Sequence, residues 1–525
     1  AAGLMTADAL SLSSLDFDMQ GRTLTLTGTT GANLTVAGDA KMGHLDAGTG
    51  PITLTVSGQL VDALSTMVGN VEVANLTSTG AVSISAASVG SVAEDFDAHV
   101  SSVSSIVAND ASQGNVVMEL RNGSAITLGS LTASQGLAQV SAVGAGLSLG
   151  STSVRDALSL QVNGGALALT QNVSANGVSL QVTGGGLTMA AASVVSSTAS
   201  ASATSLASGV NIQTSGAIAL GRLETNAAAI QVVSTGGAIT DVRATDTANI
   251  QTSGQVTVAS GAGDLTVSLR GSDTDDNGTT ASEIDVVAGS IGGLSAGNSL
   301  TIVAGGLVGQ ADIALTGLNS GTGLNVSTAA GFTGALRLQG NSTVTGEVNL
   351  TTGTGGLVMD NAAQLTVTGS MNLNSQGQVV LSRVSASGAV VLDAAGQAVT
   401  DGRTEAANAD QDTNLKAGSL SIRAASLGQG SNALDVDTLN LSSMTVTGSA
   451  WVDLTTPNLL VGGVSTAQTA RVGALSVTQG LTLNALAANL NLDSTVQAAT
   501  LSIHAQAGSL MMASNASVAS VGDIT

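Results

Sequence analysis

The sequence predicts an all-β fold, a single elongated parallel β-helix (β-solenoid) with about 20–21 residues per coil. Three observations predict it. A segment in the first half of the chain repeats at an interval of 20 residues, apolar and small polar residues alternate with a period of two, and the composition offers many small aliphatic side chains but few large ones. Each observation is considered in turn below.

The composition indicates a thin hydrophobic interior. The 525 residues include 67 glycines, three phenylalanines, one tryptophan and no tyrosine, yet 43% of the chain is hydrophobic. That hydrophobic fraction is too high for a disordered chain, despite the abundant Ser, Thr and Gly. The interior must therefore be filled by Ala, Val, Leu and Ile.

The repeat is clearest between "LSLQVNGGALAL" (158–169) and "VSLQVTGGGLTM" (178–189), which share seven of twelve positions. A second repeat at longer range relates "GGAITDVR" (236–243) to "GQAVTDGR" (396–403), at an offset of 160 residues. One unit of this length cannot bury its apolar face alone, so neighbouring units must stack. At this period the chain would make roughly 25 coils.

Within each copy the apolar residues alternate with Ser, Thr, Gln or Asn, and the copy then turns at Gly or Asn-Gly. This alternation is typical of short strands with one buried face. An antiparallel sandwich or barrel would show similar strands and is the main structural alternative. A repeat held to within one residue over several copies favours the solenoid.

We expect one continuous solenoid over 1–525, without a linker that divides it. Four segments interrupt the pattern and predict loops or excursions between coils, near 93–113, 190–210, 271–283 and 401–416. The first and third are acidic, the second is rich in Ala and Ser, and the fourth is the most polar.

The charge of the chain excludes several partners. Its formal net charge is -22, and its 13 Lys and Arg residues form no cluster, so nucleic acid is not expected as a partner. No apolar run approaches the roughly 18 residues of a membrane-spanning segment, so no membrane span is expected. Because the chain has no cysteine, it has neither disulfides nor thiolate metal ligands.

The segment "DTDDNG" predicts a calcium loop. Oxygen-bearing side chains stand at its first, third and fifth positions and a glycine at its sixth, which resembles the first half of an EF-hand loop. Position twelve is not glutamate, so a non-helical calcium loop and a solvated polar turn both remain open. The candidate ligands are Asp273, Asp275, Asp276, Asn277 and Glu283.

No other motif predicts a site. The run Glu94, Asp95 and Asp97, together with His99, is interpreted as a solvated face, with metal binding as the alternative. The three histidines are far apart in sequence, and the HExxH and Walker motifs are missing. We therefore expect no enzymatic activity and no cofactor other than calcium. A solenoid carbohydrate-binding module or polysaccharide-degrading enzyme is the alternative, since such enzymes also use parallel β-helices.

The segment "GSLSIRAASLGQGSNALDVDTLNLSSMTVTGSAWVDL" (418–454) resembles the repeat regions of giant filamentous-haemagglutinin-like bacterial adhesins. Residues that fit their "N-x-L-D-x-x-aliphatic-x-x-L" pattern are Asn432, Leu434, Asp435, Val436 and Leu439. The resemblance implies a right-handed parallel β-helix that bacteria export and display at the cell surface as a fibre.

From this resemblance and from the missing catalytic motifs, we expect an extracellular structural or adhesive protein of a bacterial surface filament, fibre or layer. Neither end of the sequence shows a polar cap, and uncapped coils expose unpaired backbone groups. The expected partners are therefore other copies of the chain, head to tail or side by side, together with cell-surface polysaccharide.

Overall fold

The computed structural model describes the chain except at the following residues: 1–4, 65–66, 69–70, 200–206, 244–246, 271–282, 395, 404–412, 456–458, 462–463, 467–468, 487 and 507. The described residues form 61 strands and no helix. They belong to two compact units, Ala1–Ala262 with Gly278–Gly289 and Gly263–Asn277 with Ser290–Thr525. Each unit is described by itself.

The strands of the first unit are β1 (Met5–Ser14), β2 (Phe17–Asp18), β3 (Thr23–Val36), β4 (Ala40–Met42), β5 (His44–Asp46), β6 (Ile52–Val56), β7 (Gln59–Asp62), β8 (Met67–Val68), β9 (Val71–Glu72), β10 (Leu76–Ala86), β11 (Ser88–Val89), β12 (Phe96–Ala108), β13 (Val116–Arg121), β14 (Ile126–Ala133), β15 (Ala138–Val143), β16 (Leu147–Val154), β17 (Ala157–Asn163), β18 (Leu167–Leu169), β19 (Val173–Ala175), β20 (Gly177–Thr183), β21 (Leu187–Met189), β22 (Val194–Ser197), β23 (Val210–Thr214), β24 (Ile218–Leu220), β25 (Arg222–Thr225), β26 (Ile230–Ser234), β27 (Ile239–Asp241), β28 (Ile250–Gln251), β29 (Gln255–Ser260) and β31 (Glu283–Val287).

The strands of the second unit are β30 (Leu265–Arg270), β32 (Ser290–Ala296), β33 (Ser299–Ala304), β34 (Ile313–Thr316), β35 (Leu318–Ser320), β36 (Gly323–Thr328), β37 (Leu336–Gln339), β38 (Asn341–Val344), β39 (Glu347–Thr352), β40 (Leu357–Met359), β41 (Gln364–Val367), β42 (Met371–Ser375), β43 (Val379–Leu381), β44 (Arg383–Ala386), β45 (Ala389–Asp393), β46 (Ala398–Asp401), β47 (Leu415–Ala417), β48 (Ser419–Ala424), β49 (Ser426–Leu427), β50 (Leu434–Thr438), β51 (Asn440–Val446), β52 (Ala450–Leu454), β53 (Leu459–Val461), β54 (Val464–Thr466), β55 (Thr469–Val477), β56 (Gly480–Ala485), β57 (Asn489–Leu492), β58 (Thr495–Ala498), β59 (Thr500–Ala505), β60 (Leu510–Met512) and β61 (Ser517–Ser520).

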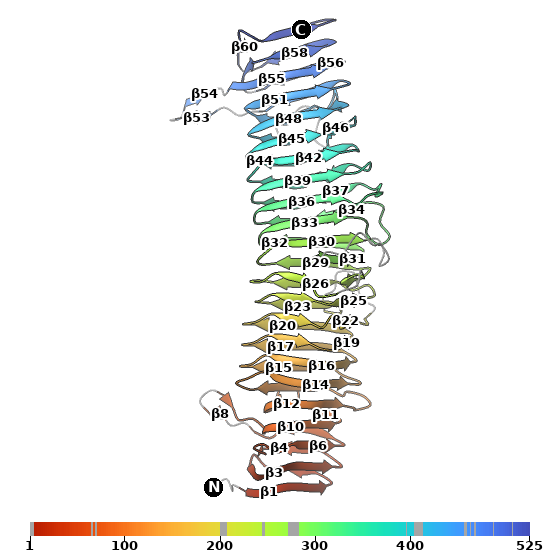
Figure 1. Ribbon diagram of the computed structural model, residues 1–525, viewed down its shortest axis with the longest axis vertical. Helices are drawn as coiled ribbons and strands as arrows, with labels where there is room; N and C mark the ends of the chain where they lie inside the picture. The colour runs from red at the N-terminus through yellow and green to blue at the C-terminus, as the bar shows by residue number, and fades with distance from the viewer. Residues whose placement is uncertain are drawn as a thin grey trace. The chain divides into compact units, whose positions relative to one another are not determined.

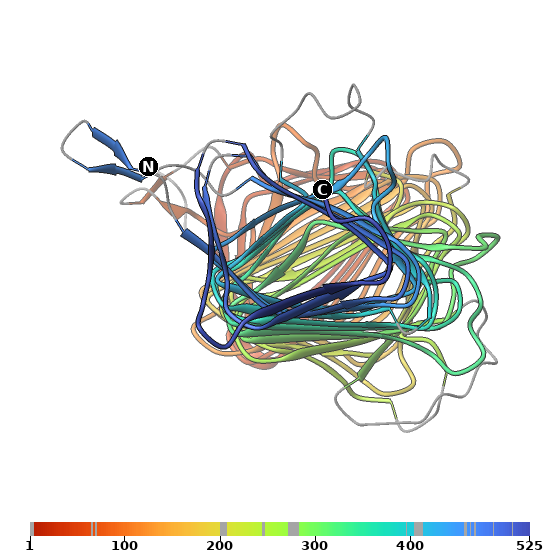
Figure 2. The same ribbon diagram turned by 90° about the horizontal axis from the view of Figure 1, so that it is seen from above.

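Each unit is a parallel β-solenoid, which confirms the predicted fold class. In the first unit β15, β17, β20, β23 and β26 pair in parallel, each with the equivalent strand of the next turn. Figure 1 shows these strands lying one above the other. In Figure 2, seen end-on, the green and blue turns of the second unit overlie one another around one interior.

The turns are slightly longer than the sequence predicted. Leu158 pairs with Val178, as the 20-residue repeat requires. Val178, however, pairs with Val210, 32 residues further on, because a loop is inserted between the two turns. The turns average about 22 residues and number about 21 in the described part of the chain, against the 20–21 residues per coil and roughly 25 coils predicted from the sequence.

The alternation of residues sets which side chains fill the interior. In β17 the inward residues Leu158, Leu160 and Val162 are at most 1% exposed, whereas Ser159 and Gln161 point outward. Burying a side chain of this size stabilises the fold by about 1.5–3 kcal/mol. Stacking of like aliphatic residues at every turn therefore builds the core without large aromatic side chains.

The predicted excursion near 93–113 is mostly wrong. Residues 96–108 form β12, in which Val100, Val103 and Ile106, each separated from the next by two serines, are buried. Within 93–113, only the short segments before and after β12 lie outside a strand. In the excursions near 190–210 and 401–416, residues 200–206 and 404–412 lie outside the described part, and the flanking residues include β22 and β47.

Candidate functional site

Most of the predicted calcium loop lies outside the described residues. Asp273, Asp275, Asp276 and Asn277 fall within 271–282, so the loop stays a prediction. Glu283 is described: it is the first residue of β31 and is only 8% exposed. The sequence predicted Glu283 as an exposed loop ligand, whereas the structure places it in a strand and buries it.

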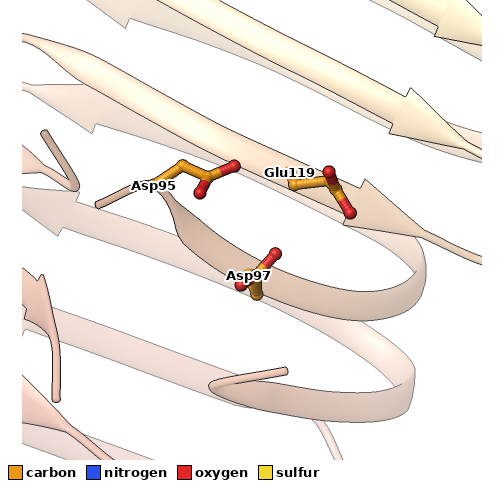
Figure 3. A group of neighbouring side chains, drawn as sticks. All are labelled: Asp95, Asp97 and Glu119. Atoms are coloured by element: carbon orange, nitrogen blue, oxygen red, sulfur yellow. The ribbon is translucent and has the colours of Figure 1, made fainter. Parts of the chain in front are cut away.

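A group of acidic side chains gathers in the first unit, where β12 pairs with β13. Asp97 of β12 stands opposite Glu119 of β13, and Asp95 lies in the loop just before β12. One carboxylate oxygen from each of the three lies within 4.8 Å of the others. Figure 3 shows the three side chains close together. The interpretation of this run as a solvated face is wrong for Asp97, which is completely buried.

Arg121, two residues after Glu119, balances part of this charge. Its guanidinium lies 3.3 Å from a carboxylate oxygen of Asp97 and contacts Glu119. Since removing a carboxylate from water costs several kcal/mol, a buried Asp97 needs such a cation or an equivalent set of hydrogen bonds. Three carboxylates can coordinate a hard cation, but here the guanidinium of Arg121 already lies among them.

Asp62, at the end of β7, belongs to the same electrostatic environment. Burial raises the pKa of Asp62 above its ordinary value of 3.8, the hydrogen bonds from Asn75 and the Leu64 amide oppose the rise, and the charges of Glu94 and Asp95 add to it. A raised pKa favours the protonated form in the folded protein. The contribution of this group to stability is therefore fullest below pH 3.8 and is lost as the pH rises through the folded pKa.

Asn75 connects Asp62 to the acidic group. Its side-chain amide donates to Asp62 and to the carbonyl oxygen of Met42 at 3.1 Å, and its side-chain oxygen accepts from the Asp97 amide at 2.9 Å. The chain leaves the turn after Asp62 as an excursion and returns at Asn75, immediately before β10. These hydrogen bonds tie the two ends of the excursion to each other and to the turns on either side. We call this arrangement an Asp-Asn clasp.

The clasp occurs three times among the described residues. Its members, given as the aspartate before the excursion, the asparagine after it and the aspartate of the following turn, are Asp62, Asn75 and Asp97; Asp241, Asn249 and Asp285; and Asp401, Asn414 and Asp435. All three asparagines are completely buried. In the second and third copies the asparagine donates to the aspartate at 2.6 and 2.5 Å, and it accepts from the next amide at 3.0 and 2.9 Å. The same hydrogen-bonding arrangement therefore recurs at three excursions of this fold.

The first and third clasps share a longer internal repeat. Between the asparagine and the second aspartate of each clasp, a two-residue strand, β11 or β49, is followed by a glycine, and a short loop leads to the strand that carries that aspartate. Gly90 and Gly428 have φ angles of 60° and 56°. A Cβ atom at Gly90 would lie 2.2 Å from the Val117 carbonyl oxygen, and one at Gly428 would lie 2.5 Å from that of Trp451. Both positions therefore require glycine.

Sequence reasoning missed the three asparagines, although a signal was present. The repeat between 236–243 and 396–403 includes two clasp aspartates, Asp241 and Asp401, and each is followed after a polar stretch by Asn and an aliphatic residue. A comparison of the two segments that follow this repeat would have found Asn249 and Asn414. The segment before Asn75, "GQLVDAL" (58–64), matches the repeated segment only in part, so this comparison would not have found Asn75.

The histidines have separate surroundings. The Nδ1 atom of His44 lies 2.6 Å from the Ala74 carbonyl oxygen, and the Nε2 atom of His504 lies 2.8 Å from the Ser502 hydroxyl. His99 on β12 stands opposite Thr77 on one side and Arg121 on the other. In the described part of the chain, no histidine belongs to a group of neighbouring side chains that could share a metal ion.

Comparison with known proteins identifies no relative: no family model, no curated protein and no solved structure matches this chain. The parallel β-solenoid fold agrees with what the resemblance to adhesin repeat regions implies, and the agreement extends to the fold alone. Among the described residues there is also no helix that is long and apolar enough to cross a membrane.

Proposed function

We propose that this chain is an extracellular structural and adhesive protein without enzymatic activity, which belongs to a filament, fibre or layer at a bacterial cell surface. The parallel solenoid supports the proposal, because each turn presents a complete set of backbone donors and acceptors to the next turn. Such a scaffold extends by adding turns and does not depend on a catalytic centre.

One observation carries the proposal. Leu490 and Leu492 of β57 point inward and are at most 1% exposed, yet their partners in β60, Leu510 and Met512, are 48% and 51% exposed. Among the described residues these two positions continue the core column but are left exposed. Contact with a second copy of the chain would bury both side chains and pair the edge of β60.

The contact that this surface would make is heterologous, since one end of a solenoid stacks on the opposite end of another. Such contacts propagate into fibres unless they close into a ring. Lateral contacts between solenoids and binding to cell-surface polysaccharide complete the proposed set of partners. Calcium at the Asp273 loop is proposed as the one cofactor.

Electron microscopy and sedimentation of the full chain test the assembly. We expect concentration-dependent, unbranched fibres from the parent chain. The double substitution Leu510→Asp and Met512→Asp places charge on the stacking surface and should abolish them. Val391→Asp is the matched control, since Val391 is 45% exposed on the side of the turn and should leave fibres unchanged. A chain that stays monomeric at millimolar concentration would contradict head-to-tail assembly.

Labelling of intact cells with an antibody against the chain tests the localisation. An extracellular surface protein is labelled without permeabilisation and is removed by a protease added outside. Labelling that requires permeabilised cells would refute the surface location, whatever the purified chain does in solution.

A further inference from the structure

Two surface grooves occupy equivalent places in the internal repeat. The first, of about 350 Å³, lies in the first unit beside the loop that precedes β12. Its polar lining includes the side chains of Gln139, Ser141, Ser159 and Gln161. None of these four side chains has a hydrogen bond to another residue of the described chain. Their donors and acceptors are thus available to a ligand.

The second groove, of about 490 Å³, lies in the second unit on β52, β56 and β59. Trp451, the one tryptophan of the chain, lines it together with Thr482 and Thr500. Gly430 lies against the indole: a Cβ atom there would be 3.5 Å from its Nε1 atom. The short loop that contains Gly430 therefore supports the ring from one side.

The register shows that the grooves are equivalent. Val117 pairs with Gln139, which pairs with Ser159, and all three line the first groove. In the second unit the corresponding column consists of Trp451, Thr482 and Ser502.

The strands beneath the two columns are also built alike. β13 pairs first with β11 and then with β12, and β52 pairs first with β49 and then with β50. In both places the preceding turn leaves the sheet as a short loop, next to Val117 or Trp451, and the outward face of the following turns carries the groove.

The linings of the two grooves select one class of ligand. Hydroxyl and amide groups predominate, an apolar side chain is present in each (Val92, which is 72% exposed, and Trp451), and each groove includes one carboxylate, from Asp95 and Asp523. Sugar hydroxyls pair with such polar groups, and the C–H faces of a sugar ring pack on apolar or aromatic side chains. The carboxylates and the net charge of -22 disfavour sulfated or phosphorylated ligands.

We infer that each groove binds a short segment of a neutral polysaccharide, so that one chain carries two glycan-binding sites of the same construction. The inference rests on the adhesive part of the proposed function and supplies its ligand. It is independent of head-to-tail assembly, which involves the surface around β60. The volumes of both grooves fall in the range of about 300–1,000 Å³ that is usual for small-molecule sites.

Isothermal titration calorimetry of the full chain tests the inference, with four neutral hexasaccharides (cello-, laminari-, malto- and N-acetylchitohexaose) and a heparin-derived hexasaccharide as the anionic comparison. We expect at least one neutral hexasaccharide to bind with two sites per chain. Gln139→Arg fills the first groove and Thr482→Arg fills the second, so each variant should retain one site and the double variant none. The changed side chains point outward, so all variants should keep the circular dichroism spectrum of the parent.

The controls carry the same substitutions on exposed residues outside the grooves. Gln213→Arg on β23 and Thr445→Arg on β51 should keep both sites. Three results would overturn the inference: no heat with any neutral hexasaccharide, two sites remaining in the double variant, or tighter binding of the anionic hexasaccharide. A single site in the parent chain would overturn the equivalence of the grooves. Fibres observed without glycan binding would leave the assembly proposal intact and refute this one.

Discussion

Replacing one clasp asparagine should destabilise the turns around it far more than replacing an asparagine on the surface. In the parent chain Asn414 donates to the Ser382 carbonyl oxygen at 3.3 Å and to the Asp401 carboxylate at 2.5 Å. It also accepts from the Asp435 amide at 2.9 Å, and it is completely buried. Asn414→Leu keeps a similar volume but removes all three hydrogen bonds.

The expected cost follows from the groups left behind. A buried donor or acceptor without a partner costs about 1–3 kcal/mol, and a hydrogen bond to a charged group is worth about 1.5–3 kcal/mol. The Asp435 amide and the Ser382 carbonyl lose a partner, and the Asp401 carboxylate loses its amide donor. Because these effects overlap, we expect a total loss of about 4 kcal/mol.

Asn349→Leu is the matched control in the same unit. Asn349 also makes two hydrogen bonds between turns, to Asn325 and from Asn372, both at 3.0 Å, but at the surface. Water replaces these bonds when they are lost, so the control should change stability by no more than about 0.5 kcal/mol.

Hydrogen exchange followed by mass spectrometry is the appropriate assay, because long repeat arrays need not unfold in one step. Peptides that cover β47 and β50 should lose protection in Asn414→Leu, while peptides that cover β36 and β39 should not. A loss below about 1 kcal/mol at β50, or a loss equal to that of the control, would refute the clasp as a source of stability.

Three further predictions concern the backbone, pH and calcium. Gly428→Ala should destabilise the chain by more than Gly396→Ala in thermal unfolding, since both have positive φ but only the first meets a backbone oxygen; equal losses would contradict this. Burial raises the pKa of Asp453, so its stabilising contribution is lost as the pH rises above 3.8, and Asp453→Asn should gain stability relative to the parent at about pH 7 but not at about pH 3. A gain that is independent of pH in denaturant titrations would disprove the pKa shift. Equilibrium dialysis should detect calcium uptake at millimolar concentration that is lost on Asp273→Ala with Asp275→Ala; no uptake by the parent would favour the polar turn.

The sequence by itself determined the fold class, because the relevant physics is local and repetitive. Alternation with a period of two decides which side chains face inward, and the 20-residue repeat between 158–169 and 178–189 decides that equivalent strands stack. The structure confirms both in β17 and β20. The scarcity of aromatic residues likewise agrees with an interior of stacked Leu, Val and Ile.

The tertiary structure decided which distant residues meet. Asn75 contacts Asp62 and the Asp97 amide, 13 and 22 positions away, because an excursion and a full turn separate them. A periodic pattern does not encode the length of each inserted loop, and loop length sets the register of every later turn. The buried Asp97, the three clasps and the two equivalent grooves all depend on that register. They become visible only when the turns are stacked.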